Sequence, residues 1–237
     1  MIYITGDNHG EIDIHKFSTK RFPGQKTMTK NDYVIICGDF GFPWCNPGDK
    51  YYNSDQNWIK WLNEKPFTTL FVDGNHENFD ILETLPEKEM FGDVVGVVSD
   101  SIFHLKRGKV YEIDGHKIFT MGGAYSHDKE HRKEHVSWWV QEVPNQAERY
   151  IALENLAKHN NTVDYVITHC IGKNTLEKIS KYIDYDEYCE FLDIIDNKVN
   201  YKHWYFGHYH EDMGVDEKHT AVYDYVFKIG EKYNYGK

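Results

Sequence analysis

One pattern constrains the fold of this chain more than any other: five short apolar runs each lead into Gly or Thr and then into Asp, Asn or His. Short apolar runs are typical of strands that are buried on both faces in an α/β protein. Open α/β folds place their ligands at the carboxyl ends of such strands. We therefore predict that the polar residues after the five runs converge on one edge of a sheet. These residues are Asp7 and His9, Asp39, Asn75 and His76, His169, and His208 and His210.

The residue types at these positions predict a site for two metal ions. Without His76, the set has two carboxylates, one amide and four imidazoles, and it contains no thiolate. Mixed nitrogen and oxygen ligands suit divalent ions such as manganese, iron or zinc. Seven ligands exceed the needs of one ion with an open position, but they suit two ions about 3.5–4 Å apart that share a carboxylate. Accidental placement of surface histidines, in a chain with 14 of them, accounts poorly for five matched strand ends.

Five sequence blocks carry a resemblance to a known family. They are, in chain order, Gly6-Asp-Asn-His9, Gly38-Asp39, Gly74-Asn-His-Glu77, Thr168-His169 and Gly207-His-Tyr-His210. In these blocks the chain resembles the calcineurin-like metallophosphoesterase superfamily. The resemblance implies an α/β fold, a four-layer α/β/β/α sandwich with two mixed β-sheets and a dinuclear metal site at the strand ends. It assigns one ion to Asp7, His9, Asp39 and His210, and the other to Asp39, Asn75, His169 and His208, with Asp39 bridging.

His76 corresponds, by the same resemblance, to a catalytic histidine that stabilises the transition state or protonates the leaving oxygen. An imidazole that titrates near neutral pH suits this role. Glu77 could orient His76, although a glutamate in a turn is more often solvated. The implied reaction is attack of a metal-bridging hydroxide on a phosphoester. Two Mn²⁺ ions are the favoured cofactors, with iron, zinc or nickel as alternatives.

The second block departs from the pattern of the phosphoprotein phosphatases. Its sequence, Gly38-Asp-Phe-Gly-Phe-Pro-Trp44, lacks their phosphate-binding arginine, and the paired histidines of the fifth block favour a phosphodiesterase or nuclease. The segment around 122–143 resembles an uncharacterised bacterial and phage branch of metallophosphoesterases. We interpret this segment as a cap-like insertion in which Arg132 and Tyr125 contact substrate. The alternative is a packed irregular loop whose tryptophans, like Trp44, fill a core.

Composition limits the partners. The formal net charge is −11, from 27 basic and 38 acidic residues, which argues against an extended nucleic-acid duplex as a partner. One basic cluster, Lys16 to Lys30, is interpreted as a solvated face. The four cysteines show no paired spacing, and the chain begins directly with an apolar strand pattern, so we expect a soluble cytoplasmic protein with no membrane segment.

The sequence therefore predicts a single metallophosphoesterase domain over 1–237 with the cap-like insertion around 122–143. The predicted function is metal-dependent hydrolysis of a phosphodiester or phosphomonoester, in a nucleotide or another small phosphorylated substrate. A nuclease acting on DNA or RNA ends and a catalytically silent binding scaffold are the alternatives. At the carboxyl end, the apolar residues 221–227 are predicted to form one last strand.

Overall fold

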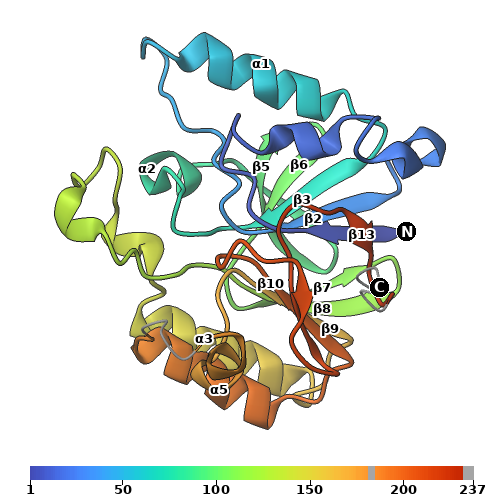
Figure 1. Ribbon diagram of the computed structural model, residues 1–237, viewed down its shortest axis with the longest axis vertical. Helices are drawn as coiled ribbons and strands as arrows, with labels where there is room; N and C mark the ends of the chain where they lie inside the picture. The colour runs from blue at the N-terminus through green and yellow to red at the C-terminus, as the bar shows by residue number, and fades with distance from the viewer. Residues whose placement is uncertain (181–184, 232–237) are drawn as a thin grey trace.

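Two β-sheets face each other at the centre of the molecule, and helices cover the outer face of each sheet (Figure 1). A computed structural model describes residues 1–180 and 185–231 of the chain. Within this range the first sheet has seven strands, in the spatial order β13 (Phe227–Lys228), β1 (Ile2–Thr5), β2 (Tyr33–Cys37), β3 (Thr68–Val72), β6 (Ile102–Leu105), β5 (Asp93–Ser99) and β4 (Glu87–Met90). The second has six, in the order β11 (Met213–Gly214), β12 (His219–Ala221), β10 (His203–Phe206), β9 (Tyr165–Thr168), β8 (His116–Met121) and β7 (Lys109–Ile113).

Both sheets mix parallel and antiparallel pairs. Strands β1, β2, β3 and β6 run parallel, while β13, β5 and β4 pair antiparallel with their neighbours. In the second sheet, β8, β9, β10 and β12 run parallel, and β7 and β11 are antiparallel. The predicted fold class, an α/β sandwich with two mixed sheets, is confirmed.

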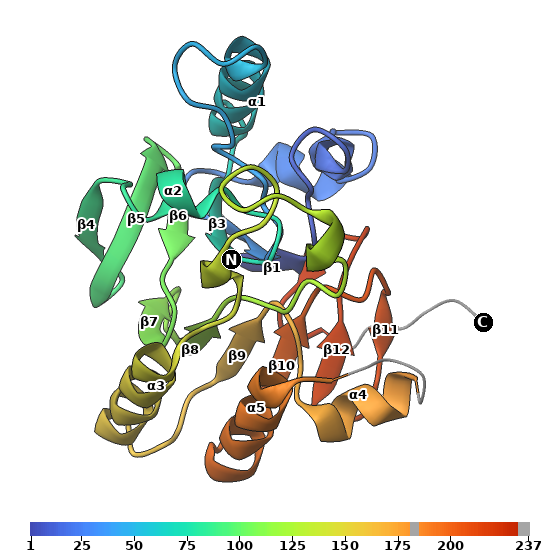
Figure 2. The ribbon, with the colours of Figure 1, turned by 90° about the vertical axis from the view of Figure 1, so that its left-hand side faces the viewer.

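The helices form two outer layers, which Figure 2 shows above and below the sheets. The layer on the first sheet contains the 3₁₀ helices η1 (Ile14–Phe17) and η2 (Pro23–Thr27) with α1 (Tyr52–Asn63) and the short α2 (Phe79–Leu82). The layer on the second sheet contains α3 (Gln146–Lys158), α4 (Lys173–Ile179) and α5 (Glu187–Lys198). Segment 122–143 is irregular apart from η3 (Lys129–His131) and η4 (Val140–Glu142). None of the helices in the described ranges has the length and apolar character needed to cross a bilayer.

The alternation of side chains along β2 explains why its whole sequence is apolar. Ile35 and Cys37 point into the layer between the two sheets, where Ile35 shares a core with Ile167 of the second sheet. Val34 and Ile36 point to the opposite face and pack in the core that contains the residues of α1. A strand with both faces covered must be apolar throughout, and it can then carry polar residues only beyond its end.

The prediction of one last strand over 221–227 is wrong. Ala221 ends β12 in the second sheet, whereas Phe227 begins β13 in the first. Between them the carboxylate of Asp212 accepts hydrogen bonds from the backbone N–H groups of Tyr223, at 2.7 Å, and Asp224, at 2.8 Å. These bonds hold the chain in a turn that carries it from one sheet to the other.

Candidate metal centre

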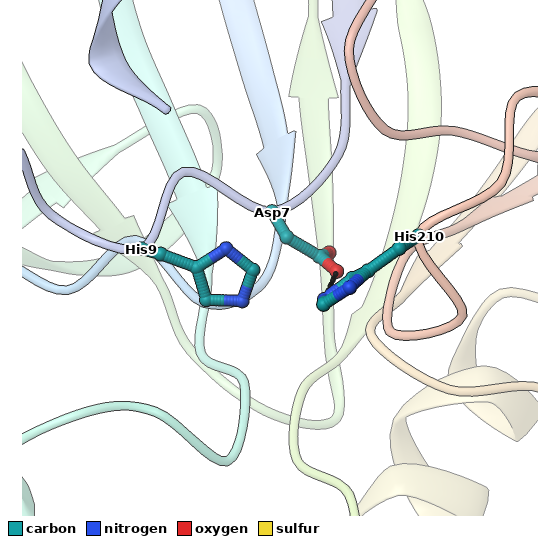
Figure 3. A group of neighbouring side chains, drawn as sticks. All are labelled: Asp7, His9 and His210. Carbon is teal, nitrogen blue, oxygen red and sulfur yellow. Dashed lines mark ion pairs between the residues drawn. The ribbon is translucent and has the colours of Figure 1, made fainter. Parts of the chain in front are cut away.

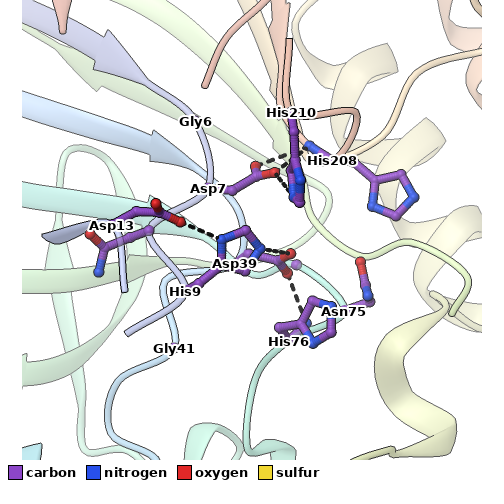
Figure 4. Close-up of polar contacts among 12 residues, drawn as sticks. Gly6, Asp7, His9, Asp13, Asp39, Gly41, Asn75, His76, His208 and His210 are labelled. Atoms are coloured by element: carbon purple, nitrogen blue, oxygen red, sulfur yellow. Dashed lines mark hydrogen bonds and ion pairs between the residues drawn. The ribbon is translucent and has the colours of Figure 1, made fainter. Parts of the chain in front are cut away.

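The polar residues of all five blocks come together where the two sheets face each other. Figure 4 labels those of four blocks, all except His169. Three blocks follow β1, β2 and β3 of the first sheet, and two follow β9 and β10 of the second. The sequence analysis placed them on one edge of one sheet. They instead lie at the ends of strands in two sheets. Three of the five strands belong to the first sheet and two to the second, so the residues that follow them can meet only where the two sheets face each other.

Asp7, His9 and His210 form one group of potential ligands (Figure 3). Their nearest nitrogen and oxygen atoms all lie within 4.8 Å of one another. Nε2 of His210 is 3.3 Å from Oδ2 of Asp7, and the rings of His9 and His210 meet edge to face with centroids 4.9 Å apart. One carboxylate and two imidazoles thus converge on one point.

Asp39 connects this group to a second one. Its Oδ2 is 3.3 Å from Nε2 of His9, and its Oδ1 is 3.2 Å from Nε2 of His169. The same nitrogen of His169 is 3.1 Å from Oδ1 of Asn75, and the His208 ring lies against His169 with a centroid separation of 4.9 Å. The two oxygens of Asp39 therefore face histidines of different groups.

The outer ring nitrogens of two of these histidines are already occupied by the protein. Nδ1 of His9 is 2.7 Å from Oδ2 of Asp13, and Nδ1 of His169 is 2.8 Å from the carbonyl oxygen of Cys37. Each partner is an acceptor, so Nδ1 donates and Nε2 is left to face Asp39. Histidines that bind metals characteristically hold their second nitrogen in this way. Asp13 was missed in the sequence analysis, because it follows no strand.

The electrostatics of the site also fit a pair of cations. Asp7 and Asp39 are fully buried, and their ion-pair partners in the described ranges are imidazoles. Burial raises the pKa of Asp7, whereas His169 and His9 overcome burial and hold the pKa of Asp39 well below its usual range. Burial would lower the pKa of His9, but hydrogen bonds to Asp39 and Asp13 raise it to about 9. Buried carboxylates that attract protons onto neighbouring rings would equally attract divalent ions. The oxygen and nitrogen donors present fit such ions.

The backbone at these positions is strained. His9, Asp39, His208 and His210 have positive φ angles of 46°, 50°, 70° and 52°. Residues other than glycine seldom adopt a positive φ angle, because this backbone conformation costs about 1–3 kcal/mol at each residue. Residues with such strained backbones cluster at functional sites. The strain directs side chains that follow different strands toward one point.

Two glycines make room for the potential ligands. A Cβ atom on Gly207 would lie 2.1 Å from Oδ1 of Asp7, and one on Gly38, where φ is +93°, would lie 2.1 Å from Nδ1 of His169. Each of these two glycines is therefore needed because a side chain from another block occupies the space where its Cβ atom would lie.

His76 lies beside the cluster and contacts Arg132. The backbone N–H of His76 donates to Oδ1 of Asp39 at 2.8 Å, and its ring is in edge-to-face contact with His9. Nη1 of Arg132 lies 3.1 Å from Nδ1 of His76, and Nε of Arg132 pairs with Asp128 at 2.8 Å. The ring atoms of His76 also fall within 4.8 Å of ligand atoms of His9 and Asp39, which is close enough for a ligand. The structure therefore brings Arg132 to His76, as a substrate-binding role would require.

Segment 122–143 packs directly against the site. Ser126 accepts a hydrogen bond from Nδ2 of Asn75 at 3.1 Å, which turns the amide oxygen of Asn75 toward His169. Trp139 is 1% exposed and donates to Asp80, so this tryptophan belongs to a core, as the alternative interpretation expected. The Tyr125 ring contacts His127 and Lys129, and Tyr125 lines a small cavity together with His208.

Glu77 does not orient His76. It is 2% exposed, and its carboxylate accepts hydrogen bonds from the backbone N–H groups of Phe40, at 2.7 Å, and Gly41, at 3.0 Å. Burial raises its pKa to about 8. Glu77 therefore holds the loop after β2 in place, because its carboxylate accepts the hydrogen bonds of two backbone N–H groups of that loop.

The basic cluster between Lys16 and Lys30 is not one solvated face. Lys16 is 1% exposed, and its ammonium donates to the carbonyl oxygens of Asp7, at 2.8 Å, Gly6 and Tyr223. The ammonium of Lys30 donates to Asn63, Phe67 and Ser101. The cluster has five basic residues, Lys16, Lys20, Arg21, Lys26 and Lys30. Two of them, Lys16 and Lys30, thus hold backbone segments together and are not available to bind phosphates.

Two facing mixed sheets with an oxygen- and nitrogen-rich cluster at their strand ends match the arrangement that the resemblance to the metallophosphoesterases implied. Comparison with known families agrees: residues 1–212 match the calcineurin-like phosphoesterase family, and the chain belongs to that family. The family uses a dinuclear site for divalent metal ions.

Curated relatives include lariat debranching enzymes. The chain is 31% identical over 144 residues to lariat debranching enzyme A of Xenopus laevis, covering 56% of this chain and 25% of that one. It is 29% identical over 193 residues to the lariat debranching enzyme of Caenorhabditis briggsae, covering 77% of this chain and 34% of that one. The chain thus spans between a quarter and about a third of the length of these relatives. A Staphylococcus aureus protein described as a 5′-nucleotidase, solved with α-ketoglutarate, shares the fold with a TM-score of 0.50 at 15% identity, over 94% of this chain and 48% of that one.

Proposed function

We propose that this protein hydrolyses a phosphodiester bond in a small phosphorylated substrate, with nucleotides as the leading class. The observation that carries the proposal is the position of Asp39. It is buried, and its two oxygens face His9 and His169 at 3.3 and 3.2 Å. A carboxylate in this position is suited to bridge two ions, as two-metal hydrolysis requires.

The proposed ligands divide into two sets that share Asp39. The first set is Asp7, His9, Asp39 and His210, and the second is Asp39, Asn75, His169 and His208. Manganese is the proposed native metal, because it accepts carboxylate, amide and imidazole donors together. Bound divalent ions would supply an activated water and neutralise charge on the phosphoryl oxygens. The residues contribute fixed positions: Asp13 and the Cys37 carbonyl orient two imidazoles, and Ser126 orients Asn75.

Proton transfer to the leaving oxygen is proposed for His76. Its Nδ1 faces Arg132, so the other nitrogen, Nε2, is the one that can carry a proton toward substrate. Arg132 is proposed to contact the phosphoryl group as well, within a cap formed by 122–143 in a single domain. Tyr125 is proposed to contact substrate as well, because it lines a small cavity together with His208. The four cysteines are free thiols, which supports the predicted cytoplasmic location.

A second candidate is a nuclease that acts on RNA or DNA ends. The similarity to lariat debranching enzymes supports it. The net charge of −11 and the buried amine of Lys16 weigh against contacts to an extended duplex.

A panel of phosphomonoesters, phosphodiesters, cyclic nucleotides and short RNAs, assayed with added Mn²⁺, tests the proposal. We expect the wild type to prefer diesters. Asp39→Asn should lose turnover and metal together, since the amide removes the charge that both ions share. Asp100→Asn, at an exposed turn position, serves as the matched control. Normal turnover with two ions per chain in Asp39→Asn would show that the bridging assignment is wrong.

A further inference from the structure

A cavity of about 450 Å³ opens directly from the candidate metal centre. His9 and His76 line one end of it, and the loop after β2 and the first half of α1 form its walls. Its volume falls in the usual range for small-ligand sites. A substrate whose phosphoryl group contacts His9 and His76 would place a neighbouring substituent in this space.

The walls of the cavity are aromatic. Phe42, Trp44, Tyr51 and Trp58 all contribute to the lining. Neither lysine nor arginine is among the lining residues, while Glu11 and Asp55 are. Away from His9 and His76, a second phosphate would thus find two carboxylates and no lysine or arginine. The cavity favours an uncharged group with a flat apolar surface.

Hydrogen bonds hold two of these aromatic residues in place. The indole N–H of Trp58 donates to Glu11 at 3.1 Å, and Ser54 donates to the same carboxylate at 3.4 Å. Asp55 accepts from the backbone N–H of Trp44 at 3.2 Å, and the Trp44 ring rests edge-on against the buried Trp139, with centroids 5.5 Å apart. Both carboxylates are occupied in supporting the walls, so they are poorly placed to attract a cationic ligand.

We propose that this cavity binds the nucleobase of the substrate, so that the scissile phosphate belongs to a nucleoside. The inference rests on the proposed phosphodiesterase function and specifies its substrate. Every nucleobase presents a flat π-face, so stacking on aromatic side chains depends little on which base is bound. A trimethylammonium group, which aromatic residues also bind, would leave much of this volume empty.

Equilibrium binding to the Mn²⁺-loaded protein tests the proposal without requiring turnover. Adenosine 5′-monophosphate and ribose 5-phosphate differ only by the base, so the ratio of their dissociation constants in calorimetry isolates the cavity. We expect the nucleotide to bind about 5- to 150-fold more tightly, the range for one stacked base. Tyr51→Ala and Trp58→Ala should move the ratio toward one.

Tyr150→Ala is the matched control. Tyr150 is 63% exposed and Tyr51 is 62% exposed, but Tyr150 lies on α3, outside the cavity. Because Tyr51 is mostly exposed, its removal should leave the fold intact even if Trp58→Ala does not. The control should keep the wild-type ratio.

Three results would overturn the nucleobase assignment: equal affinity for the two phosphates, a ratio that survives both cavity variants, or phosphocholine binding as tightly as the nucleotide. Failure of the proposed function gives a different signature, namely no Mn²⁺-dependent hydrolysis of bis(4-nitrophenyl) phosphate by the wild type. In that case, binding of adenosine and of ribose, each monitored by tryptophan fluorescence during a titration, still reports on the cavity alone.

Discussion

One hydrogen bond decides which nitrogen of His76 carries its proton. The guanidinium of Arg132 can only donate, so Nδ1 of His76 must accept and the neutral ring keeps its proton on Nε2. Burial lowers the pKa of His76, and Arg132 reinforces this effect while Asp39 opposes it. The neutral ring therefore presents an Nε2–H that can donate a hydrogen bond to the leaving oxygen. Complete transfer of a proton requires the imidazolium, because a neutral ring that lost its proton would become an imidazolate.

His76→Asn separates this role from metal binding. We expect two ions per chain to remain, while turnover of esters with poor alkoxide leaving groups falls by about 10²–10⁴-fold. A nitrophenyl ester needs no proton on its leaving oxygen and should suffer less. Metal analysis and the ratio of the two rates are the measurements.

His159→Asn, at the end of α3, is the control and should leave both rates unchanged. An equal loss of turnover on the two substrates would mean that His76 stabilises charge in the transition state or positions the substrate, rather than protonating the leaving group. Loss of one ion would instead make His76 a ligand, as its closeness to His9 and Asp39 allows.

The sequence identified the potential ligands but not the residues that orient them. Asp7, Asp39 and His169 each follow an apolar strand, and this local pattern can be read from the chain directly. Asp13 and Ser126 act through contacts to His9 and Asn75, and the second contact joins positions 51 apart. No local pattern distinguishes such residues from ordinary loop positions.

At the scale of elements, the glycine between β10 and His208 couples two strands from opposite sheets. Gly207→Ala would place a methyl group 2.1 Å from Asp7 and 2.6 Å from the Cys37 carbonyl. Its backbone φ lies outside the left-handed region, so the effect is steric. We expect metal affinity to fall by about 10–100-fold, as when the support of a ligand is disturbed.

Gly214→Ala in β11 is the matched control, because nothing lies within 4 Å of its added Cβ and its φ is also outside the left-handed region. Calorimetric titration with Mn²⁺ compares the two variants. Equal affinities would show that the structure has room at Gly207.

Lys16 on η1 holds the loop after β1 to the turn between β12 and β13. Its removal in Lys16→Met takes the ammonium away from the carbonyl oxygens of Gly6, Asp7 and Tyr223, of which Tyr223 keeps the hydroxyl of Thr5 as a donor. We expect a loss of about 1.5–3 kcal/mol in the free energy of unfolding, measured with urea on metal-free protein. Lys20→Met, at an exposed position, should change it by less than about 0.5 kcal/mol. Similar values for both variants would refute the structural role of Lys16.

For the whole molecule, the sequence predicted the type of fold better than it predicted which strands belong to which of the two sheets. The family blocks indicated two sheets, and the Asp114-Gly115 turn joins β7 and β8 in a hairpin, as an Asp-Gly pair between two strand-like runs indicates. Yet β6 pairs with β3 in the first sheet, whereas β7 and β8 lie in the second. Apolar runs on both sides of this division look alike, because both sheets are buried. The polar edge strand β4, with its exposed Glu87 to Glu89, gave no apolar signal at all.

Metal binding should stabilise the entire chain, since its potential ligands come from both sheets. A ligand present at 100 times its dissociation constant adds about 2.7 kcal/mol, which corresponds to about 5–11 °C in the melting temperature of a domain this size. Thermal unfolding with excess Mn²⁺ and with a chelator measures this shift. In Asp39→Asn the shift should be much smaller. An unchanged melting temperature in the wild type would argue against both ion positions.

The separation of Asp7 from His208 sets the time at which the site can first exist in a cell. The two residues touch through a hydrogen bond from the His208 backbone, but they are 201 positions apart in the chain. At about 5–20 residues per second, a ribosome needs about 10–40 s to synthesise the stretch between them. During that interval the first carboxylate emerges without its distant partners. Acquisition of the proposed ions must therefore wait until His208 has been synthesised, because the groups that follow the strands of the second sheet complete the site.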